Sequence, residues 1–435
     1  MNNKIIILIF FIIINSGCSF NKNSEFWADT ENITKEKNEE YKEIFSDEKA
    51  LAKEFNANIS INLGNIFNND HKLRDYFNND GRLNYNGALK KSSRYKFSKI
   101  KNFYQFEPNI SFINNNIIFF DKKGSILKFD DSSKLVWKKN YYSKLEKKLN
   151  PILQFANNAN TLLVADNRAK YYALDINNGN LLWLKNNLAP FNSQIKIYKD
   201  RFFIIDFSNT LRCFSLKDGK ELWNIKTENS LIQSQKKLSM VIVNNLIYFK
   251  NSIGDISAVD IDQGELLWQL PTQSSLVYEG AFSLETSDLI TDGETLFFSN
   301  NKNQFFSIDL ESGTINWENR VNSSTRPSLI GNYIFTVSIE GYLIIIEKKN
   351  GNIIRVTDIF NSFKKKVREE IKPVGFVMGS NNIYLTTDHG RLIVIDTKTG
   401  RSKFILKLDN NKISRPFIVE KRLYVVKDNA IIKLD

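Results

Sequence analysis

The chain has 435 residues, 42% of them hydrophobic and 13% aromatic, so it can bury a large core, and length alone would allow two or three domains. Its formal net charge is +12, but the lysines are spread along the chain, so we expect solubility and weak attraction to acidic surfaces, and no nucleic-acid partner. Two cysteines exclude a disulfide framework.

The first residues have the features of a targeting segment. Lys4 gives a positive start, residues 5–14 form an apolar run, and residues 15–17 are small or polar and precede Cys18. The run is shorter than the roughly 20 residues that a membrane-spanning helix needs. Small residues before a cysteine resemble a bacterial lipobox, so we interpret residues 1–18 as a lipoprotein signal peptide with Cys18 lipidated. An ordinary signal peptide with an incidental cysteine is the alternative.

Residues 19–93 differ in composition from the rest of the chain. Their first part is rich in Glu and Lys and predicts a tether or a marginal helix. An Asn- and Gly-rich stretch follows, and we expect its apolar side chains to lie on the outside of the next domain, leaving the tether partly docked. These side chains are Leu73, Tyr76, Phe77, Leu83 and Tyr85.

Residues 94–435 are built from one repeated pattern of Asp, a polar turn, Gly and Trp. DINNGNLLW at 175–183 is a complete copy, and the copies return at a period of roughly 40 to 50 residues, which indicates a propeller or a solenoid. Within each copy the Asp side chain can hydrogen-bond the turn, and the Gly supplies the positive φ of a hairpin. The turn glycines are Gly179, Gly219, Gly264, Gly313, Gly351 and Gly400.

Two short strands precede each such hairpin, so each unit reads as a four-stranded antiparallel sheet that must stack on its neighbours. Seven turn copies are followed by three more strands, and the last of these ends at Asp435. The eighth sheet therefore lacks one strand. We expect residues 94–100 to supply it, with Phe97 near the tryptophan position. The predicted fold is an all-β, eight-bladed β-propeller closed by this N-terminal strand.

The tryptophans occupy one position on the fourth strand of successive units. A stacking platform for a quinone or a sugar is one interpretation, but the fixed position favours a structural role, each indole packing against the adjacent blade. We therefore assign a structural role to Trp137, Trp183, Trp223, Trp268 and Trp317, together with the turn glycines Gly179, Gly219, Gly264 and Gly313.

Several connectors interrupt the regular repeat. Residues 360–373 are strongly charged and predict a short helical turn outside the ring; we interpret this turn as a solvated connector, with binding of an acidic partner or lipid head groups as the alternative. The connectors after Trp223 and Trp268 place apolar residues where strand packing does not need them, which makes them candidates for a protein interface. These residues are Leu231, Ile232, Leu276, Val277, Phe282 and Leu284.

No pattern in the chain nominates a catalytic, cofactor or metal site. The two histidines, His71 and His389, have no Cys or His neighbour at metal-ligand spacing. The sequence also lacks the haem-attachment, nucleophile-elbow, phosphate-loop and dinucleotide motifs. We therefore expect a protein that is not an enzyme and needs no cofactor.

The repeats resemble those of pyrroloquinoline-quinone dehydrogenases, and eight of them behind a lipobox resemble the BamB family of lipoproteins of the outer-membrane β-barrel assembly machinery. This resemblance implies a non-enzymatic scaffold on the periplasmic face of the outer membrane. It would assist assembly and insertion of β-barrel proteins by binding a BamA-like subunit, and would also contact unfolded outer-membrane proteins. Carried over by position, the partner-binding residues are Leu231, Ile232, Gln233 and Asp288.

Two other functions stay open at this stage. A quinone-dependent dehydrogenase shares the repeat, but such enzymes usually carry a vicinal cysteine pair, which this chain lacks. A propeller that binds envelope polysaccharide or peptide at the mouth of the ring is the other alternative, since any propeller has a central channel.

Overall fold

The computed structural model describes residues 53–68, 70–228, 234, 236–273 and 284–435. The chain divides into a unit Met1–Lys49, which lies outside the described residues, and a unit Ala50–Asp435. Cys18 and the targeting segment therefore lie outside the described part.

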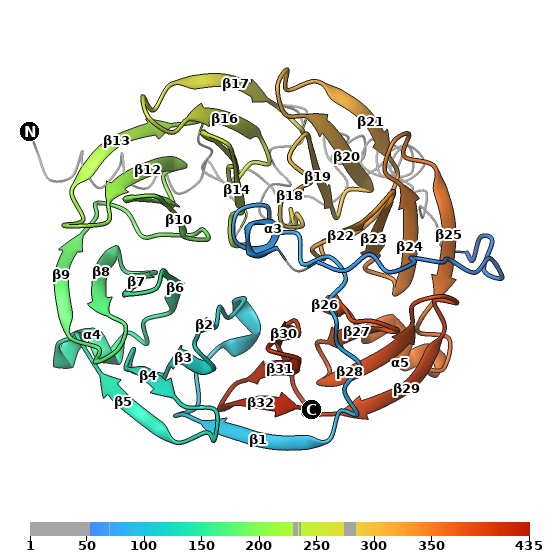
Figure 1. Cartoon of the computed structure of the whole chain (residues 1–435), viewed down its shortest axis with the longest axis horizontal. Helices are drawn as coiled ribbons and strands as arrows, with labels where there is room; N and C mark the ends of the chain where they lie inside the picture. Colours follow the sequence, from blue (N-terminus) through green and yellow to red (C-terminus); the bar gives the residue numbers. More distant parts are fainter. Residues whose placement is uncertain (1–52, 69, 229–233, 235, 274–283) are drawn as a thin grey trace, which may run out of the picture. The chain divides into compact units, whose positions relative to one another are not determined.

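The second unit is a ring of eight four-stranded antiparallel sheets, as predicted (Figure 1). Blade 1 contains β2 (Ser111–Ile113), β3 (Asn116–Phe120), β4 (Ile126–Phe129) and β5 (Leu135–Lys139), and blade 2 contains β6 (Leu153–Asn157), β7 (Thr161–Asp166), β8 (Lys170–Asp175) and β9 (Leu181–Asn186). Blade 3 contains β10 (Lys196–Tyr198), β11 (Arg201–Ile205), β12 (Thr210–Ser215) and β13 (Glu221–Lys226), and blade 4 contains β14 (Met240–Val243), β15 (Leu246–Lys250), β16 (Ile256–Asp260) and β17 (Leu266–Leu270).

The remaining four blades continue the same order from the centre outward. Blade 5 contains β18 (Ile290–Thr291), β19 (Thr295–Asn300), β20 (Gln304–Asp309) and β21 (Ile315–Asn319), and blade 6 contains β22 (Ser328–Ile330), β23 (Tyr333–Val337), β24 (Tyr342–Glu347) and β25 (Ile353–Asp358). Blade 7 contains β26 (Pro373–Met378), β27 (Asn382–Thr387), β28 (Arg391–Asp396) and β29 (Ser402–Lys407), and blade 8 contains β30 (Phe417–Val419), β31 (Arg422–Lys427), β32 (Ala430–Leu434) and β1 (Lys91–Lys96).

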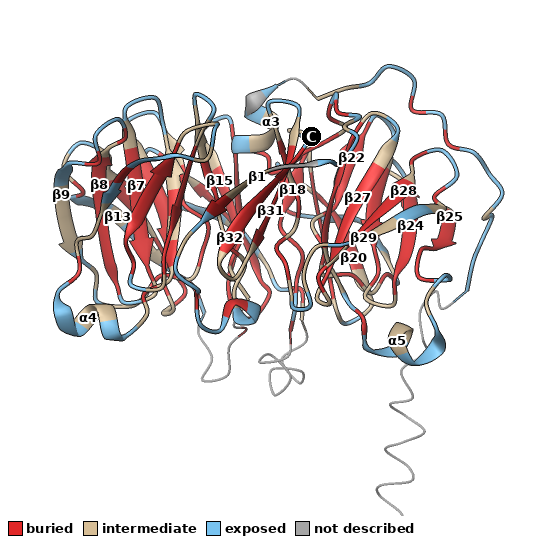
Figure 2. Cartoon of the chain, turned by 90° about the horizontal axis from the view of Figure 1, so that it is seen from below, coloured by how far each residue is buried: buried red, intermediate tan, exposed pale blue. Residues whose placement is uncertain are grey.

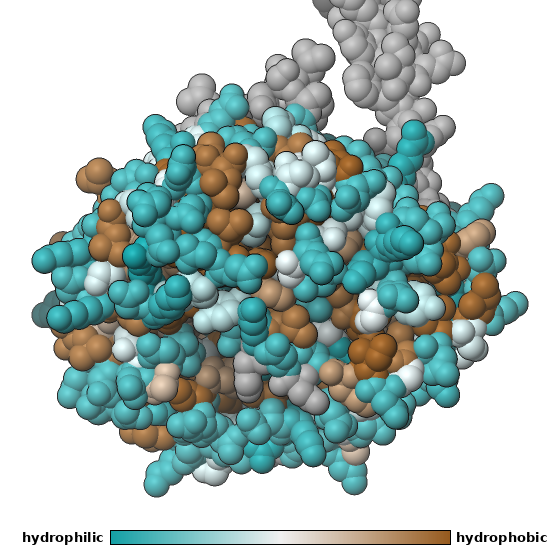
Figure 3. All heavy atoms as spheres, turned by 45° about the horizontal axis from the view of Figure 1, so that its top comes forward, coloured by the Kyte–Doolittle hydropathy of each residue, from teal (hydrophilic) through white to brown (hydrophobic). Residues whose placement is uncertain are grey.

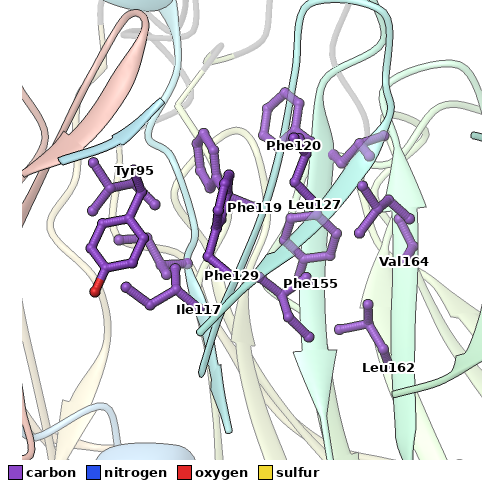
Figure 4. Packing of buried hydrophobic residues seen from close by; sticks show 14 of the residues in the cluster. Tyr95, Ile117, Phe119, Phe120, Leu127, Phe129, Phe155, Leu162 and Val164 are labelled. Carbon is purple, nitrogen blue, oxygen red and sulfur yellow. The ribbon is translucent and has the colours of Figure 1, made fainter. Parts of the chain in front are cut away.

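The N-terminal strand β1 closes the ring by pairing with β32, which confirms the predicted closure. Figure 4 shows Tyr95 of β1 beside residues of blade 1, and its ring lies 5.7 Å from that of Phe129, edge to face. The two ends of the chain's folded region thus share one sheet and one core cluster.

The position of Phe97 differs from the prediction. In the other blades the tryptophan position pairs with the residue two before the turn Asp, as Trp183 pairs with Ala173. In blade 8 the equivalent partner, Lys433, pairs with Ser93. Phe97 follows β1 and packs against Phe119, with ring centroids 5.0 Å apart. The shift arises because β1 begins at Lys91, three residues earlier than expected, and contains a register irregularity.

The helices are short and lie at the two ends of the blades. Figure 2 shows α3 (His71–Asp75) on one face of the ring and α4 (Lys144–Lys148) and α5 (Lys365–Glu370) on the other. We call these the strap face and the connector face. A 3-10 turn, η1 (Phe103–Gln105), precedes blade 1. Helix α5 forms in the charged connector where a helical turn was predicted.

Five of the turn glycines lie under the tryptophan of the preceding blade, and Gly400 lies under Arg355. A Cβ atom on Gly264 would stand 2.6 Å from the ring of Trp223, and one on Gly219 would stand 2.6 Å from that of Trp183. The same contact joins Gly313 to Trp268 and Gly179 to Trp137. With φ near +70° at these glycines, the turn needs both the left-handed backbone and the missing side chain. The indoles therefore lie at the blade junctions.

The indole N–H groups also cross these junctions. Trp183, Trp223, Trp268 and Trp317 donate from Nε1 to a backbone carbonyl of the next blade at 3.0–3.2 Å. Trp137 makes no such bond within the described residues, because Lys128 Nζ donates to the corresponding carbonyl of Ile176 at 3.0 Å.

An N-terminal strap, residues 53–68 and 70–90, pairs with the outermost strand of blade 6 at Phe55 and then crosses the strap face (Figure 1). Phe77, Leu83 and Tyr85 are buried against the blades, and Leu73 and Tyr76 are half-buried. Phe77 packs with blades 4 and 5, whereas Leu83 and Tyr85 pack with blades 7 and 8. These apolar side chains were expected on the outside of the propeller; they lie between the strap and the strap face, which buries them on both sides of the ring axis.

Candidate partner-binding face and axial cluster

Of the predicted partner-binding residues, only Asp288 lies in the described part of the chain. Leu231, Ile232 and Gln233 lie outside it, as do Leu276, Val277 and Phe282. Asp288 precedes the innermost strand of blade 5 and is 9% exposed. Leu284, expected on an exposed connector, is buried at 3% exposure.

Asp288 belongs to a group of charged side chains near the ring axis. Its Oδ2 accepts a hydrogen bond from Arg326 Nε at 2.6 Å. Arg326 Nη1 lies 3.6 Å from Asp80 Oδ2, which also pairs with Arg415 Nη1 at 2.8 Å. We call Asp80, Asp288, Arg326 and Arg415 the axial cluster. It joins blades 5, 6 and 8 to the strap.

The electrostatics of the axial cluster follow from its burial. Burial alone would raise the pKa of Asp288, but the charge of Arg326 outweighs it and the pKa lies below its ordinary value. Burial likewise acts to raise the pKa of Asp80, and Arg415 and Arg326 reverse the shift. Both carboxylates are therefore ionised at neutral pH.

Residues 78–80 of the strap place polar side chains over the axis. Asn78 Nδ2 lies within 3.0–3.2 Å of acceptors on Gln194, Ser239, Met240 and Leu289, which come from blades 3, 4 and 5. Asn79 Oδ1 accepts from the backbone N–H of Leu329 of blade 6 at 3.0 Å. The strap thus hydrogen-bonds to the inner parts of blades 3, 4, 5 and 6, and these bonds stiffen the centre of the ring.

Sequence reasoning missed the axial cluster, although one signal was present. Arg326 and Arg415 occupy equivalent places in Thr325-Arg326-Pro327 and Ser414-Arg415-Pro416, directly before the first strands of their blades. Inner strands converge on the axis in a propeller, so two arginines in equivalent positions indicate a shared acidic partner. That partner, Asp80, lies outside the repeats and could not be inferred from them.

A different surface runs around the circumference of the ring. The outermost strands carry exposed apolar side chains close to the tryptophan position, with exposures of 42–54%. These residues are Leu135, Val136, Leu181, Leu182, Leu222, Leu266, Leu267, Ile315 and Phe404. On the side that Figure 3 presents, hydrophobic residues form separate groups among hydrophilic ones.

The outer edge of blade 6 already pairs with an extended segment of the strap. Phe55 N–H donates to Val356 O at 3.1 Å, and Val356 N–H donates to Phe55 O at 2.9 Å. This is a two-bond antiparallel bridge to an outermost strand. The edge of a blade in this ring can therefore accept an additional strand.

The described residues contain neither a cluster of metal-ligating side chains nor a membrane-spanning helix. Within them, no three His, Cys, Asp or Glu side chains come together as a metal site would require. No helix in the described ranges is long and apolar enough to cross a membrane.

Comparison with known proteins places these features in context. The chain is 23% identical over 286 residues to the outer membrane protein assembly factor BamB of Shewanella oneidensis, covering 60% of this chain and 65% of that protein. It is also 23% identical over 248 residues to BamB of Moranella endobia, covering 54% of this chain and 61% of that protein. The chain thus matches less than two thirds of the length of either relative.

Solved structures share the architecture at low sequence identity. BamB from Moraxella catarrhalis superposes with a TM-score of 0.64 at 13% identity, covering 80% of this chain and 100% of that one. Quinohemoprotein alcohol dehydrogenase from Comamonas testosteroni gives 0.62 at 10% identity, covering 83% and 79%. These likenesses show the eight-bladed fold, which binding proteins and dehydrogenases share.

The assignment to a family depends on a more extensive match. The family model described as "Outer membrane protein assembly factor BamB" matches residues 122–357 and 363–435, which is most of the propeller. This chain belongs to the BamB family.

Proposed function

We propose that this chain is a non-enzymatic scaffold lipoprotein that assists the assembly and insertion of outer-membrane β-barrel proteins. The observation that carries the proposal is the family match over residues 122–357 and 363–435. The fold supports it, because a closed ring with packed blade junctions presents its connectors at fixed positions. A lipid on Cys18 would anchor the chain to the periplasmic face of the outer membrane.

The proposed partner is a BamA-like subunit, bound through the connectors after Trp223 and Trp268. In this proposal Leu231, Ile232 and Gln233 supply contacts from the first connector. Asp288 stands where the second connector returns to the ring, and its bond to Arg326 fixes that return. Asp288 therefore acts by holding the connector in place as much as by touching a partner.

The test is partner recovery from membranes of the native organism or a close relative. A tagged chain should co-purify with a BamA-like protein, and the double variant Leu231→Asp, Ile232→Asp should reduce recovery by about tenfold, since charges in an apolar contact are costly. Leu188→Asp is the matched control, because Leu188 is 97% exposed on the connector between blades 2 and 3. Equal recovery with both variants would place the interface elsewhere, and absence of the partner from the wild-type sample would overturn the proposal.

The exposed blade edges support a second contact, to the unfolded β-barrel proteins themselves. Barrel strands alternate apolar and polar residues and are unpaired before assembly, so they suit an edge with apolar side chains nearby. The pairing of Phe55 with Val356 is an intramolecular example of this geometry. A photo-crosslinker at Leu182 on β9 should capture an unfolded barrel protein, whereas one at Leu188 should not; equal capture at the two positions would argue against edge pairing.

A further inference from the structure

Helix α4 presents two exposed leucines in the connector between blades 1 and 2. Leu145 is 74% exposed, and Leu149, which caps the helix at its C-terminus, is 51% exposed. The two are four positions apart, so they lie on the same side of the helical turn. Figure 2 shows α4 projecting from the blades at the connector face. Neighbouring apolar side chains that are this exposed indicate a contact surface.

Hydrogen bonds hold α4 in a fixed position on the ring. The backbone N–H of Ser143 donates to Glu146 Oε2 at 2.7 Å, and the N–H of Glu146 donates to Ser143 Oγ at 3.3 Å. Glu146 Oε1 also pairs with Lys170 Nζ of blade 2 at 2.5 Å. At the other end of the helix, Arg168 Nη2 donates to the carbonyl of Leu149 at 3.1 Å. The exposed leucines are therefore presented by a helix that is tied to blade 2 at both ends.

The segments that meet at α4 carry more bases than acids. They are the turn 121–125 of blade 1, residues 140–151 around the helix, and the turn 166–169 of blade 2. Asn140 Nδ2 joins the helix segment to the first turn, because it donates to the carbonyl of Lys123 at 3.0 Å. The acids of these segments are Asp121, Glu146 and Asp166, and the bases are Lys122, Lys123, Lys144, Lys147, Lys148 and Arg168.

The three acids are already engaged. Asp121 Oδ2 pairs with Lys138 Nζ at 2.8 Å. The hydrogen bond from the lysine of blade 2 lowers the pKa of Glu146 to about 2, so this carboxylate is ionised and its charge is paired. Asp166 is buried and accepts a hydrogen bond from Tyr142 Oη at 2.6 Å. None of the six bases has a carboxylate within ion-pair distance in the described part of the chain, so their positive charge faces solvent.

We propose that this surface docks on a membrane that contains acidic phospholipid. We call it the α4 patch, and it consists of the exposed basic and apolar residues of the three segments: Lys123, Lys144, Leu145, Lys148, Leu149 and Arg168. The leucine side chains enter the interfacial layer of the bilayer, and the long basic side chains reach the headgroup phosphates. Charge complementarity selects this occupant, since an acidic leaflet attracts lysine and arginine that lie close to its surface.

Helix α5 lies on the same face of the ring but lacks this combination. Lys365 and Lys366 are exposed, and two acids follow them. Glu369 and Glu370 are also exposed, so they offset the positive charge. The nearby side chain of Phe363 packs against the core cluster of blades 6 and 7. Of the two helices, α4 is the one that combines unpaired positive charge with apolar side chains in solvent.

This inference goes beyond the proposed function. A lipid on Cys18 would hold the chain near a bilayer without fixing which side of the ring faces it. Docking through the α4 patch would turn the connector face of blades 1 and 2 toward the headgroups. The patch contains none of the residues proposed to contact a BamA-like partner.

The experiment places an environment-sensitive fluorophore, nitrobenzoxadiazole, on the full-length Cys18→Ser chain at Leu149→Cys. Cys213 is buried and stays unlabelled. Vesicles of phosphatidylcholine with a quarter of phosphatidylglycerol should raise the emission of the label and shift it to shorter wavelength. Vesicles of phosphatidylcholine alone should not. The matched control is the same label at Ile66→Cys, because Ile66 is also 51% exposed but lies on the strap, so its emission should not change. The label reports only on its own position, so attachment through residues 1–18 does not produce the signal.

Charge variants then test the electrostatic part of the contact. In the chain labelled at Leu149→Cys, the double variant Lys144→Gln, Lys148→Gln should require at least about tenfold more acidic lipid for half of the response, since each lysine near an acidic surface changes affinity roughly fivefold. The control is Lys217→Gln, Lys349→Gln, which removes the same charge from exposed turns at the opposite end of the blades. Circular dichroism checks folding. Added salt should weaken the response of the unsubstituted chain for the same reason, whatever the fate of the variants.

Several results would overturn the proposal. An equal response to neutral and acidic vesicles, or an equal response of the labels at Leu149→Cys and Ile66→Cys, would show unspecific adsorption. A response to soluble polyglutamate without one to vesicles would assign the α4 patch to an acidic protein. Vesicle binding needs no BamA-like subunit, so this inference and the proposed function fail independently.

Discussion

Substituting Gly264 by alanine tests whether the contact between a turn and the preceding tryptophan holds the blades together. Gly264 has φ +70°, and an added Cβ would stand 2.6 Å from Cδ2 and 2.8 Å from Cγ of Trp223. Contacts under 3.0 Å cannot be accommodated without movement of the indole. Gly64 provides a matched control, because its φ is +56° and a Cβ there meets nothing within 4 Å.

The two substitutions share one cost and differ in another. A left-handed backbone costs a non-glycine residue about 1–2 kcal/mol, which both variants incur. Gly264→Ala must in addition displace Trp223, with an overpacking cost of about 1–3 kcal/mol. Displacement also breaks the 3.0 Å bond from Trp223 Nε1 to Ile261 O, worth about 1 kcal/mol. We expect a loss of about 3–6 kcal/mol for Gly264→Ala and about 1–2 kcal/mol for Gly64→Ala.

Urea unfolding followed by far-UV circular dichroism measures both losses. A double-mutant cycle sharpens the result, since in a Trp223→Ala background the Cβ at Gly264 no longer meets an indole. There Gly264→Ala should cost no more than Gly64→Ala does in the wild type. If Gly264→Ala and Gly64→Ala were equally destabilising in the wild-type chain, the packing of the indole on the turn would not be what fixes the junction.

Three further expectations follow from buried polar groups. Burial acts to raise the pKa of Asp80, but its arginine partners lower it overall. The ionised carboxylate therefore stabilises the fold above its ordinary pKa, and this stability is lost as pH falls through the lowered pKa. Asp80→Asn should cost about 3–5 kcal/mol of unfolding free energy at pH 7 and progressively less in acid, measured from urea midpoints. Arg355→Met should speed trypsin cleavage within residues 53–62, because Arg355 Nη1 donates to a strap carbonyl at 2.8 Å. Burial raises the pKa of the Cys213 thiol to about 12. In a Cys18→Ser chain at pH 8, a thiol reagent should therefore modify Cys213 only when the protein unfolds. Rapid modification of the native protein would contradict the burial of this side chain.

The blade architecture was predictable because its signals are local. Within one turn, Asp175 Oδ1 accepts from the backbone of Asn177 at 2.8 Å and Asn178 at 3.2 Å, and Gly179 takes φ +72°. These interactions are encoded in a few consecutive residues and recur in each copy. Counting copies then showed that one strand was missing, and β1 supplies it.

The features that were not predicted depend on the pairing register of β1 and on residues that the closed ring brings together at its axis. Whether Ser93 or Phe97 takes the tryptophan position is decided by an irregularity in the pairing of β1 with β32, which the spacing of apolar residues does not reveal. The axial cluster brings together Asp80 from the strap and Arg415 from blade 8, which are 335 positions apart. Such a contact exists only once the ring has closed, so it has no local signature.

Tryptophans stabilise some of the blade junctions, and the strap stabilises others. Tryptophans occupy the junctions from blade 1 to blade 6, and the position then passes to Arg355 and to the exposed Phe404. Arg355 is fully buried and donates both to Lys398 O, in the next turn, and to Ile59 O of the strap. It thus keeps the bond across the junction and adds one to the N-terminal segment.

The strap also buries apolar side chains at the two junctions where Arg355 and Phe404 stand in the tryptophan position. Ile61 and Leu63 pack with blades 6 and 7, and Leu83 and Tyr85 pack with blades 7 and 8. At the last junction, Asp131 of blade 1 accepts hydrogen bonds from Arg422 and Lys433 of blade 8, replacing indole packing with ion pairs. Loss of tryptophan in the later repeats is therefore compensated by strap side chains at two junctions and by ion pairs at the third, and removal of the strap should weaken the junctions between blades 6, 7 and 8 first.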